Sequence, residues 1–203
     1  MTKTSVVDAQ FDTAEVILQN PDRSCPDDVF DTLGVLSVQY RGFDDRVHTG
    51  QIVVAIDIMS EVEAFFQQAL ELAFPIERVI PVSAPGYRWN GKKVLADNLT
   101  SGFDYRKVAT QKKMSLHSLG RAFDVNPQQN PYIRYEEGGR KEILHVPEGT
   151  KHDPSKPGTL YDRHPLVLLM EGFGWTWGGR WTPADGRVDH MHFEKSLGSQ
   201  SKA

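Results

Sequence analysis

The chain has 203 residues, of which 39% are hydrophobic and 25% are charged, and its formal net charge is −4. This length and composition suit one globular domain that needs no disulfides for its stability. The small negative charge excludes a general attraction for nucleic acid, and apolar runs such as Leu166 to Met170 are far shorter than the roughly 20 residues that cross a bilayer. A single cysteine, Cys25, excludes an internal disulfide and a cysteine-rich zinc site.

We expect three parts along the chain. Residues 1–34 are polar and interrupted by two prolines, which predicts an N-terminal arm or helix packed on the domain. Residues 35–197 contain the apolar patterns of a folded domain, and residues 198–203 are expected to form a flexible tail. No repeat and no low-complexity tract divides the domain further.

The domain begins with two predicted strands. Apolar and polar residues alternate over residues 36–40, and residues 51–56 are rich in β-branched side chains. A helix is expected from Ser60, because Ser60 and Glu63 have the spacing of a capping box and the apolar residues that follow recur at helical spacing. Pro75 is expected to stop this helix.

Shorter elements are expected in the middle of the chain. Residues 78–82 predict a short strand, whereas residues 84–101 are rich in Gly, Pro and Asn and predict a long loop. Residues 122–125 predict another strand, and residues 138–158 predict a second polar loop. Residues 165–171 predict a buried helix with Pro at its first turn and Gly at its end.

The C-terminal segment is expected to consist of strands. Residues 175–181 predict a strand, a glycine turn and a second strand, which would place three tryptophans on one face, in the core: Trp175, Trp177 and Trp181. Residues 188–194 predict the last strand. Because strands and helices are interspersed without a βαβ rhythm, we predict an α+β fold with a mainly antiparallel sheet.

Two segments carry residues that commonly ligate metals: residues 115–124 (SLHSLGRAFD) and residues 189–194 (DHMHFE). His117 and Asp124 are seven residues apart. On a straight helix this separation is about 10.5 Å of rise, which is too far for the two side chains to share an ion. The chain should therefore turn back at Gly120, and a strand over the following residues would direct Asp124 to the site.

His192 is expected to supply a third ligand from the last strand. Two histidines and one carboxylate match a catalytic zinc site whose fourth position is open to a water molecule, and zinc lowers the pKa of that water towards about 7. The water needs a general base, and Asp189 is the candidate. Since residues i and i+3 of a strand point to opposite faces, Asp189 should lie in the turn entering the strand. Two alternatives stay open: His190 and His192 form the ligand pair, or these residues are unrelated polar side chains.

The two segments together resemble a known family. Ser115-x-His117-x-x-Gly120-x-Ala122-x-Asp124, followed by Asp189-x-x-His192-Phe-Glu194, is similar to the signature of the VanY-like zinc peptidases. This family contains D-alanyl-D-alanine carboxypeptidases, peptidoglycan L-alanyl-D-glutamate endopeptidases and phage endolysins. The resemblance extends over residues 36–197 and includes SGFDYR at residues 101–106 and GWTWGGRW at residues 174–181.

The resemblance implies a fold and a set of functional residues. The fold is the one that these peptidases share with hedgehog signalling domains, a small antiparallel sheet flanked by helices. The implied ligands of one zinc ion are His117, Asp124 and His192, which agrees with the spacing argument. The implied base is Asp189, where members specific for D,D-dipeptides carry Glu, so that narrow substrate specificity is left open.

Further residues of the site are also suggested by the resemblance. Arg106 matches the arginine that stabilises the oxyanion of the substrate, with Arg88 as a lesser candidate and a surface ion pair as the alternative. Ser115 is expected either to hydrogen-bond the substrate or to cap the turn. Glu194 is expected to orient a ligand histidine or to be an ordinary charge at the end of a strand.

These residues predict a zinc-dependent metallopeptidase domain over residues 35–197 that hydrolyses peptide bonds in peptidoglycan stem peptides, as a D,D-carboxypeptidase or an L,D-endopeptidase. The expected partner is the peptide substrate, and a monomer is the default. A non-catalytic zinc-containing module for cell-wall binding or signalling is the alternative, and a hydrolase of another amide is a third possibility. The polar N-terminus does not resemble a secretory signal, which predicts a cytoplasmic location by default, with action at the cell wall after release left open.

Overall fold

The computed structural model describes residues 6–12, 20, 24–108 and 113–197, so the tail predicted for residues 198–203 lies outside the described part. Within it, the strands form three sheets of three strands and one of two strands, accompanied by short helices. Most of the strand pairs are antiparallel, and the predicted α+β class is confirmed. The expectation of one small sheet is wrong, because the C-terminal strands divide between two separate sheets.

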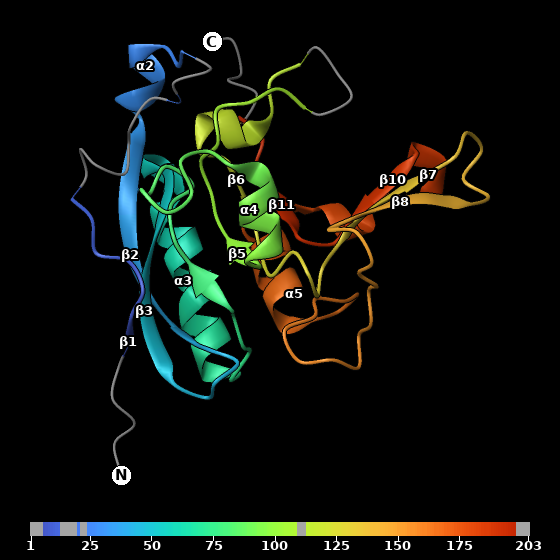
Figure 1. Cartoon of the computed structure of the whole chain (residues 1–203), viewed down its shortest axis with the longest axis horizontal. Helices are drawn as coiled ribbons and strands as arrows, with labels where there is room; N and C mark the ends of the chain where they lie inside the picture. The colour runs from blue at the N-terminus through green and yellow to red at the C-terminus, as the bar shows by residue number, and fades with distance from the viewer. Residues whose placement is uncertain (1–5, 13–19, 21–23, 109–112, 198–203) are drawn as a thin grey trace.

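A long hairpin forms one side of the molecule (Figure 1). Strands β2 (Leu33–Arg41) and β3 (Val47–Ala55) pair antiparallel along their whole length. Both of the strands predicted here are present, and both are longer than the sequence pattern indicated. Strand β1 (Val6–Val7) from the predicted arm pairs parallel with β3, and the short helix α2 (Asp27–Phe30) precedes β2. The boundary of the arm at residue 34 stays a prediction.

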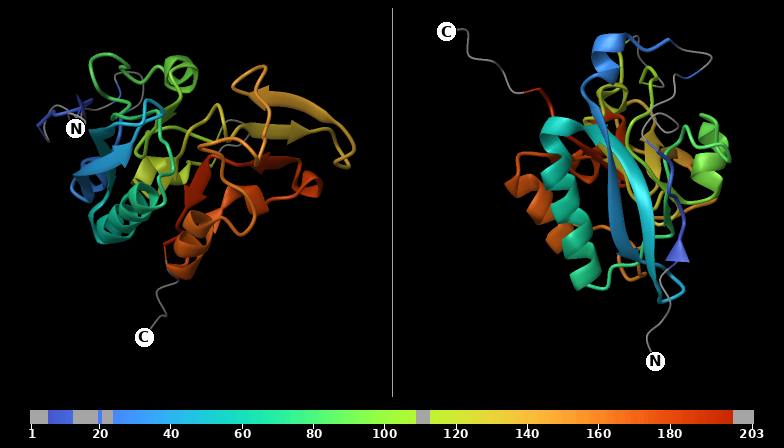
Figure 2. Two further views of the ribbon diagram at one scale, coloured as in Figure 1. Left: turned by 90° about the horizontal axis from the view of Figure 1, so that it is seen from below. Right: turned by 90° about the vertical axis from the view of Figure 1, so that its left-hand side faces the viewer.

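Helix α3 (Met59–Glu71) packs against β2, and both views of Figure 2 show it running beside the hairpin. Its buried face consists of four residues, as the helical spacing predicted: Val62, Phe65, Phe66 and Ala69. The predicted capping box is wrong, because the 3-10 helix η1 (Ile56–Ile58) leads directly into α3 and places Ser60 inside the helix. The helix ends before Pro75, where the chain adopts a positive φ of 52° at Ala73.

Two regions predicted as loops contain regular elements. The first holds helix α4 (Gly91–Ala96) and strand β5 (Leu99–Thr100), which pairs parallel with β4 (Arg78–Val79). Asn90 caps α4 by accepting a hydrogen bond from the backbone of Lys93. The second holds β8 (Glu142–Val146), which pairs with β7 (Tyr132–Tyr135). The Gly and Pro residues in these regions mark the ends of short elements rather than long loops.

The C-terminal segment departs most from the prediction. Helix α5 (Pro165–Gly172) and strand β9 (Thr176–Trp177) are present, but the 3-10 helix η3 (Gly178–Arg180) replaces the expected turn and second strand. Another 3-10 helix, η4 (Pro183–Asp185), precedes β10. Trp175 and Trp177 are buried in the main core, whereas Trp181 lies outside it, because η3 interrupts the alternation of side chains.

The single strand predicted over residues 188–194 is two strands. Strand β10 (Arg187–Asp189) pairs with β7, and β11 (His192–Glu194) lies between β6 (Ala122–Asp124) and β9. Figure 1 shows β7, β8 and β10 projecting together from the rest of the fold. None of the helices in the described residues combines the length and hydrophobicity that a membrane span needs.

Candidate metal centre

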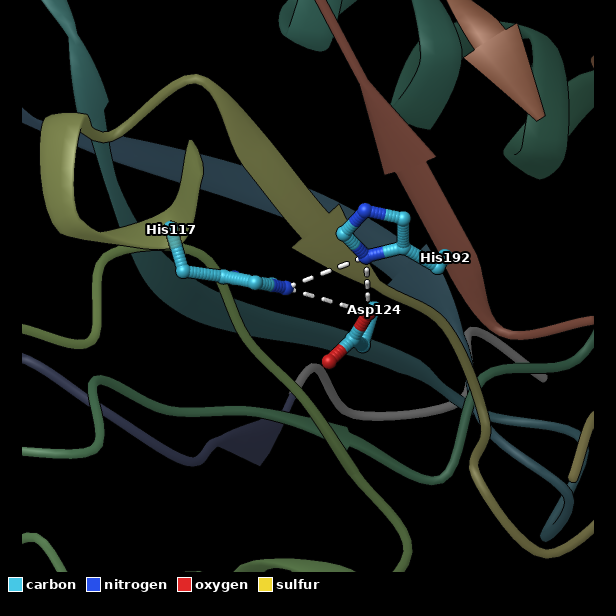
Figure 3. A group of neighbouring side chains, drawn as sticks. All are labelled: His117, Asp124 and His192. Carbon is cyan, nitrogen blue, oxygen red and sulfur yellow. Dashed lines mark hydrogen bonds and ion pairs between the residues drawn. The ribbon is translucent and has the colours of Figure 1, made fainter. Parts of the chain in front are cut away.

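The structure brings His117, Asp124 and His192 together, although they come from three elements (Figure 3). His117 lies in the 3-10 helix η2 (Leu116–Leu119), Asp124 ends β6, and His192 begins β11 directly opposite Asp124 in the sheet. Nε2 of His117 is 3.2 Å from Nδ1 of His192 and 3.3 Å from Oδ1 of Asp124. Oδ1 of Asp124 is 3.0 Å from Nδ1 of His192, which closes the triangle.

The turn between His117 and Asp124 depends on Gly120, as the spacing argument predicted. Gly120 has a φ of 63°, a conformation that glycine adopts without the cost of a side chain. A Cβ atom at this position would lie 2.6 Å from the backbone nitrogen of Ala55, so the neighbouring hairpin also excludes a side chain. Phe123 is fully buried in the core, which directs the alternating Asp124 towards the site.

Hydrogen bonds fix which nitrogen of each histidine faces the centre. Nδ1 of His117 lies 2.7 Å from the backbone oxygen of Gly102, which can only accept, so Nδ1 carries the proton and Nε2 presents a lone pair. Nε2 of His192 lies 3.1 Å from a carboxylate oxygen of Glu194, and Nδ1 lies 3.0 Å from Oδ1 of Asp124, so that with a metal ion in the centre Nε2 would donate to Glu194 and Nδ1 would present its lone pair. Such partners behind the ligands are typical of metal-binding histidines.

Nε2 of His117, Nδ1 of His192 and Oδ1 of Asp124 therefore face one another, an arrangement that a proton on His192 or a bound cation would stabilise. Ligands at the corners of a tetrahedron around zinc, with bonds of about 2.0 Å, lie about 3.3 Å from one another. The observed separations of 3.0, 3.2 and 3.3 Å match this dimension. The donor set, two imidazoles and one carboxylate, also suits zinc. We conclude that these three residues can hold a metal ion.

The electrostatic environment favours positive charge at this point. Burial lowers the pKa of His192, but hydrogen bonds to Asp124 and Glu194 outweigh it and raise the pKa to about 10. Burial raises the pKa of Asp124, yet the two histidines hold it well below its usual range. The same carboxylates that stabilise a proton on His192 would stabilise a divalent cation.

Asp189 lies beside the three ligands but is not one of them. It ends β10, and the turn formed by His190 and Met191 separates it from β11. The expectation that Asp189 occupies a turn is thus wrong, because Asp189 is the last residue of a strand. Asp189 and His192 belong to strands of different sheets, so the alternation of side chains along one strand does not apply to them. Its Oδ1 is buried and has no hydrogen-bond partner. Burial raises the pKa of Asp189, and the charge of Asp124 adds to this although that of His192 opposes it.

The other predicted residues occupy different positions around this centre. Arg106 donates from Nε to Asp104 at 2.9 Å, and its positive charge acts on Asp189. Ser115 caps η2 by accepting a hydrogen bond from the backbone of His117 at 3.3 Å, so the capping role is present. Arg88 is exposed on the loop before α4.

The structure separates His190 from the metal ligands. Its ring stacks on that of His152, with 3.6 Å between the centroids, and its Nδ1 lies 3.1 Å from the backbone oxygen of Pro131. In the described part of the chain, the group of side chains able to hold a metal includes His192 but not His190. The alternative ligand pair is therefore wrong, because these two residues are not on one strand.

Two supporting residues were not found from the sequence. Gly102 supplies the backbone oxygen that orients His117, and Ser118 holds the neighbouring segment by bonding both backbone groups of Arg106. Gly102 approaches the hairpin so closely that a Cβ would lie 2.3 Å from the oxygen of Val53. The only sign of this role in the sequence is the glycine in SGFDYR. A glycine does not show that its backbone oxygen contacts His117.

Residues 109–195 match the model of a family described as D-alanyl-D-alanine carboxypeptidase. The match contains both motifs and all three candidate ligands, so the predicted resemblance is confirmed over this part of the chain. It supports the predicted class of enzyme, a hydrolase of peptide bonds. Comparisons with curated proteins and with solved structures give no match.

Proposed function

We propose that this chain is a zinc-dependent metallopeptidase that hydrolyses peptide bonds in the stem peptides of peptidoglycan. The observation that carries the proposal is the triangle of ligand atoms on His117, Asp124 and His192, beside the unpartnered Oδ1 of Asp189. The match of residues 109–195 to a family of D-alanyl-D-alanine carboxypeptidases supports the substrate class. The proposal includes the fold shared with hedgehog domains, and it covers both D,D-carboxypeptidase and L,D-endopeptidase activity.

His117, Asp124 and His192 would hold a zinc ion through Nε2, Oδ1 and Nδ1, and the ion would supply a Lewis acid that lowers the pKa of a water molecule and polarises the carbonyl of the substrate. Gly102 and Glu194 keep the two histidines in the tautomers that this binding needs. Because a backbone oxygen of Gly102 and the side chain of Glu194 hold the two rings, the ligand geometry is set before substrate arrives.

Asp189 moves the proton in this proposal. Its Oδ1 accepts a proton from the attacking water and delivers it to the nitrogen of the departing amine. Burial makes this carboxylate more basic than an exposed aspartate, which brings its pKa closer to that of the water. The free Oδ1 is available for this role because no side chain or backbone group of the described residues bonds to it.

Arg106 provides positive charge for the oxyanion that forms at the substrate carbonyl. The support is its position: Ser118, next to the ligand His117, holds the backbone of Arg106, and the guanidinium acts electrostatically on Asp189. Fixed positive charge near a developing oxyanion stabilises the transition state more than the ground state. The hydroxyl hydrogen of Ser115 remains available to bond the substrate, because the Ser115 oxygen only accepts in the cap.

The proposal is tested by incubating the purified protein with soluble peptidoglycan fragments and determining the masses of the products. We expect cleavage that a chelator stops and added zinc restores, and no cleavage by the His117→Ala variant. His145→Ala is the matched control, because His145 also contacts a backbone oxygen and a glutamate but lies outside the centre. Absence of metal-dependent cleavage by the wild-type protein would disprove the proposed activity.

A non-catalytic zinc module is the alternative, and Asp189 argues against it. A purely structural site gains nothing from a buried carboxylate oxygen without a partner, which costs about 1–3 kcal/mol. Removing zinc distinguishes the two: a structural ion takes the fold with it, whereas a catalytic ion chiefly supports turnover. Circular dichroism of the protein before and after chelation measures the difference.

A further inference from the structure

A pocket of about 490 Å³ lies on the projecting sheet formed by β10, β7 and β8. Its walls are aromatic and charged, and the side chains that matter to the argument are Tyr132, Arg134, Tyr135, Trp181, Asp185 and Arg187. None of these residues is a metal ligand or one of the residues that orient the ligands.

Two arginines of the pocket lie directly opposite each other. In the antiparallel pair of β10 and β7, Arg187 is the partner of Arg134, so both side chains are on the same face of the sheet. Their neighbours Val188 and Ile133 point to the other face and are buried. Like charges in this position destabilise a sheet, so a bound anion would remove a cost that the free protein bears.

In the part that the structure describes, neither arginine forms a close ion pair with a carboxylate, although the charge of Arg187 acts on Asp185, Asp189 and Glu194. Elsewhere in the fold arginines are paired: Arg180, for example, contacts both Glu171 and Asp162. The carboxylate in the pocket, that of Asp185, uses Oδ2 to accept hydrogen bonds from the backbone and hydroxyl of Thr182. The guanidinium carbon of Arg187 lies 4.3 Å from the centre of the Trp181 ring, which limits the directions in which Arg187 can point.

The pocket adjoins the metal centre. The ring of Trp181 is 5.6 Å from that of His192, measured between centroids. On the same sheet face as the arginines, the next cross-strand pair is Tyr132 and Asp189. Two residues along a strand span about 7 Å, so the arginine pair lies roughly one or two peptide units beyond the proposed general base.

We propose that Arg134 and Arg187 bind a carboxylate of the substrate peptide, one or two residues from the bond that is cut. The inference rests on the proposed function and adds its substrate class, an acidic peptide. Two cationic side chains on one rigid sheet can contact both oxygens of a carboxylate, and Trp181 and Tyr132 flank the peptide between this contact and the metal centre.

The test compares the stem pentapeptide L-Ala-γ-D-Glu-L-Lys-D-Ala-D-Ala with two analogues, one amidated at its C-terminus and one at the α-carboxylate of D-Glu. The wild-type protein should cleave the free acid with a higher kcat/KM than at least one amide. In the Arg134→Gln/Arg187→Gln variant, we expect this ratio to fall by about tenfold or more, because charged hydrogen bonds to the carboxylate are lost. Arg140→Gln removes the same charge from the neighbouring turn, outside the pocket, and should keep the wild-type ratio.

The possible failures are distinguishable. A wild-type protein that cleaves none of the peptides contradicts the proposed function, and the carboxylate site falls with it. A wild-type protein that cleaves acid and amides equally, or a double variant that keeps the full preference, contradicts the carboxylate site alone. If thermal unfolding shows that the double variant is not folded, Arg134→Gln, which changes an exposed side chain, replaces it in the same comparison.

Discussion

Replacing Glu194 by glutamine tests the proposed orientation of His192 without touching a metal ligand. Oε2 of Glu194 accepts the hydrogen bond from Nε2 of His192 at 3.1 Å, and this bond lowers the pKa of Glu194. Glutamine has nearly the same shape but no charge. The imidazole of His192 therefore loses the negative charge that makes its Nδ1 more basic. Loss of such a partner typically weakens metal binding by about 10- to 100-fold. We expect the lower end of this range, because the side chain of Glu194 is 28% exposed.

The assay is a competition for zinc between the protein and a chelating dye at fixed pH and ionic strength. Glu142→Gln is the matched control, because Glu142 accepts from Nε2 of His145 at 2.9 Å but neither residue belongs to the metal centre. The expected result is a zinc Kd raised about tenfold in Glu194→Gln, equivalent to about 1.4 kcal/mol, and unchanged in Glu142→Gln. An unchanged Kd in Glu194→Gln would refute the proposed contribution of the Glu194 charge to zinc binding by His192.

Three further predictions concern the turn at Gly120, His48 on β3 and the proposed base. Gly120→Ala should lower the free energy of unfolding by about 2 kcal/mol or more, measured by urea denaturation, because it forces a side chain into a positive φ against the hairpin. Burial lowers the pKa of His48, but hydrogen bonds to Asp44 and Asp8 raise it above 6.5, so its stabilising contribution should be complete below pH 6.5 and lost as the pH rises through the raised pKa. A His48→Asn variant should lack this dependence in urea titrations at several pH values. Asp189→Asn should lower kcat by about 10²- to 10⁴-fold while zinc content, measured by elemental analysis, stays the same.

The turn that brings His117 and Asp124 together was predictable because it follows from local geometry. The distance between His117 and Asp124 on a helix is too great, and the glycine between them is the residue that allows the chain to turn. The spacing left open whether His190 belongs to the ligand set, and the family resemblance implied His192 as the third ligand. The carbonyl of Gly102 was not predictable, because a backbone oxygen leaves no trace in the sequence.

The substrate side of the site was not predictable for a different reason. Arg134 and Arg187 are opposite each other only through the register of β7 and β10, which are far apart in the sequence. The alternation of side chains along one strand shows which of its residues share a face. It does not show which other strand pairs with that strand, or in which register. The short helix α4 and strand β8 were missed because a few residues between Gly and Pro give too little periodicity to identify an element.

The change of sheet between β10 and β11 links the two halves of the proposed site. One continuous strand could not direct both Asp189 and His192 to the same point, because residues three apart alternate in direction. With the turn at His190 and Met191, β10 stays with β7 and carries Asp189 and Arg187 on one face, while β11 joins β6 and carries His192 opposite Asp124. A shift of β10 by one residue against β7 would therefore remove the base and the carboxylate contact together and leave the three metal ligands in place.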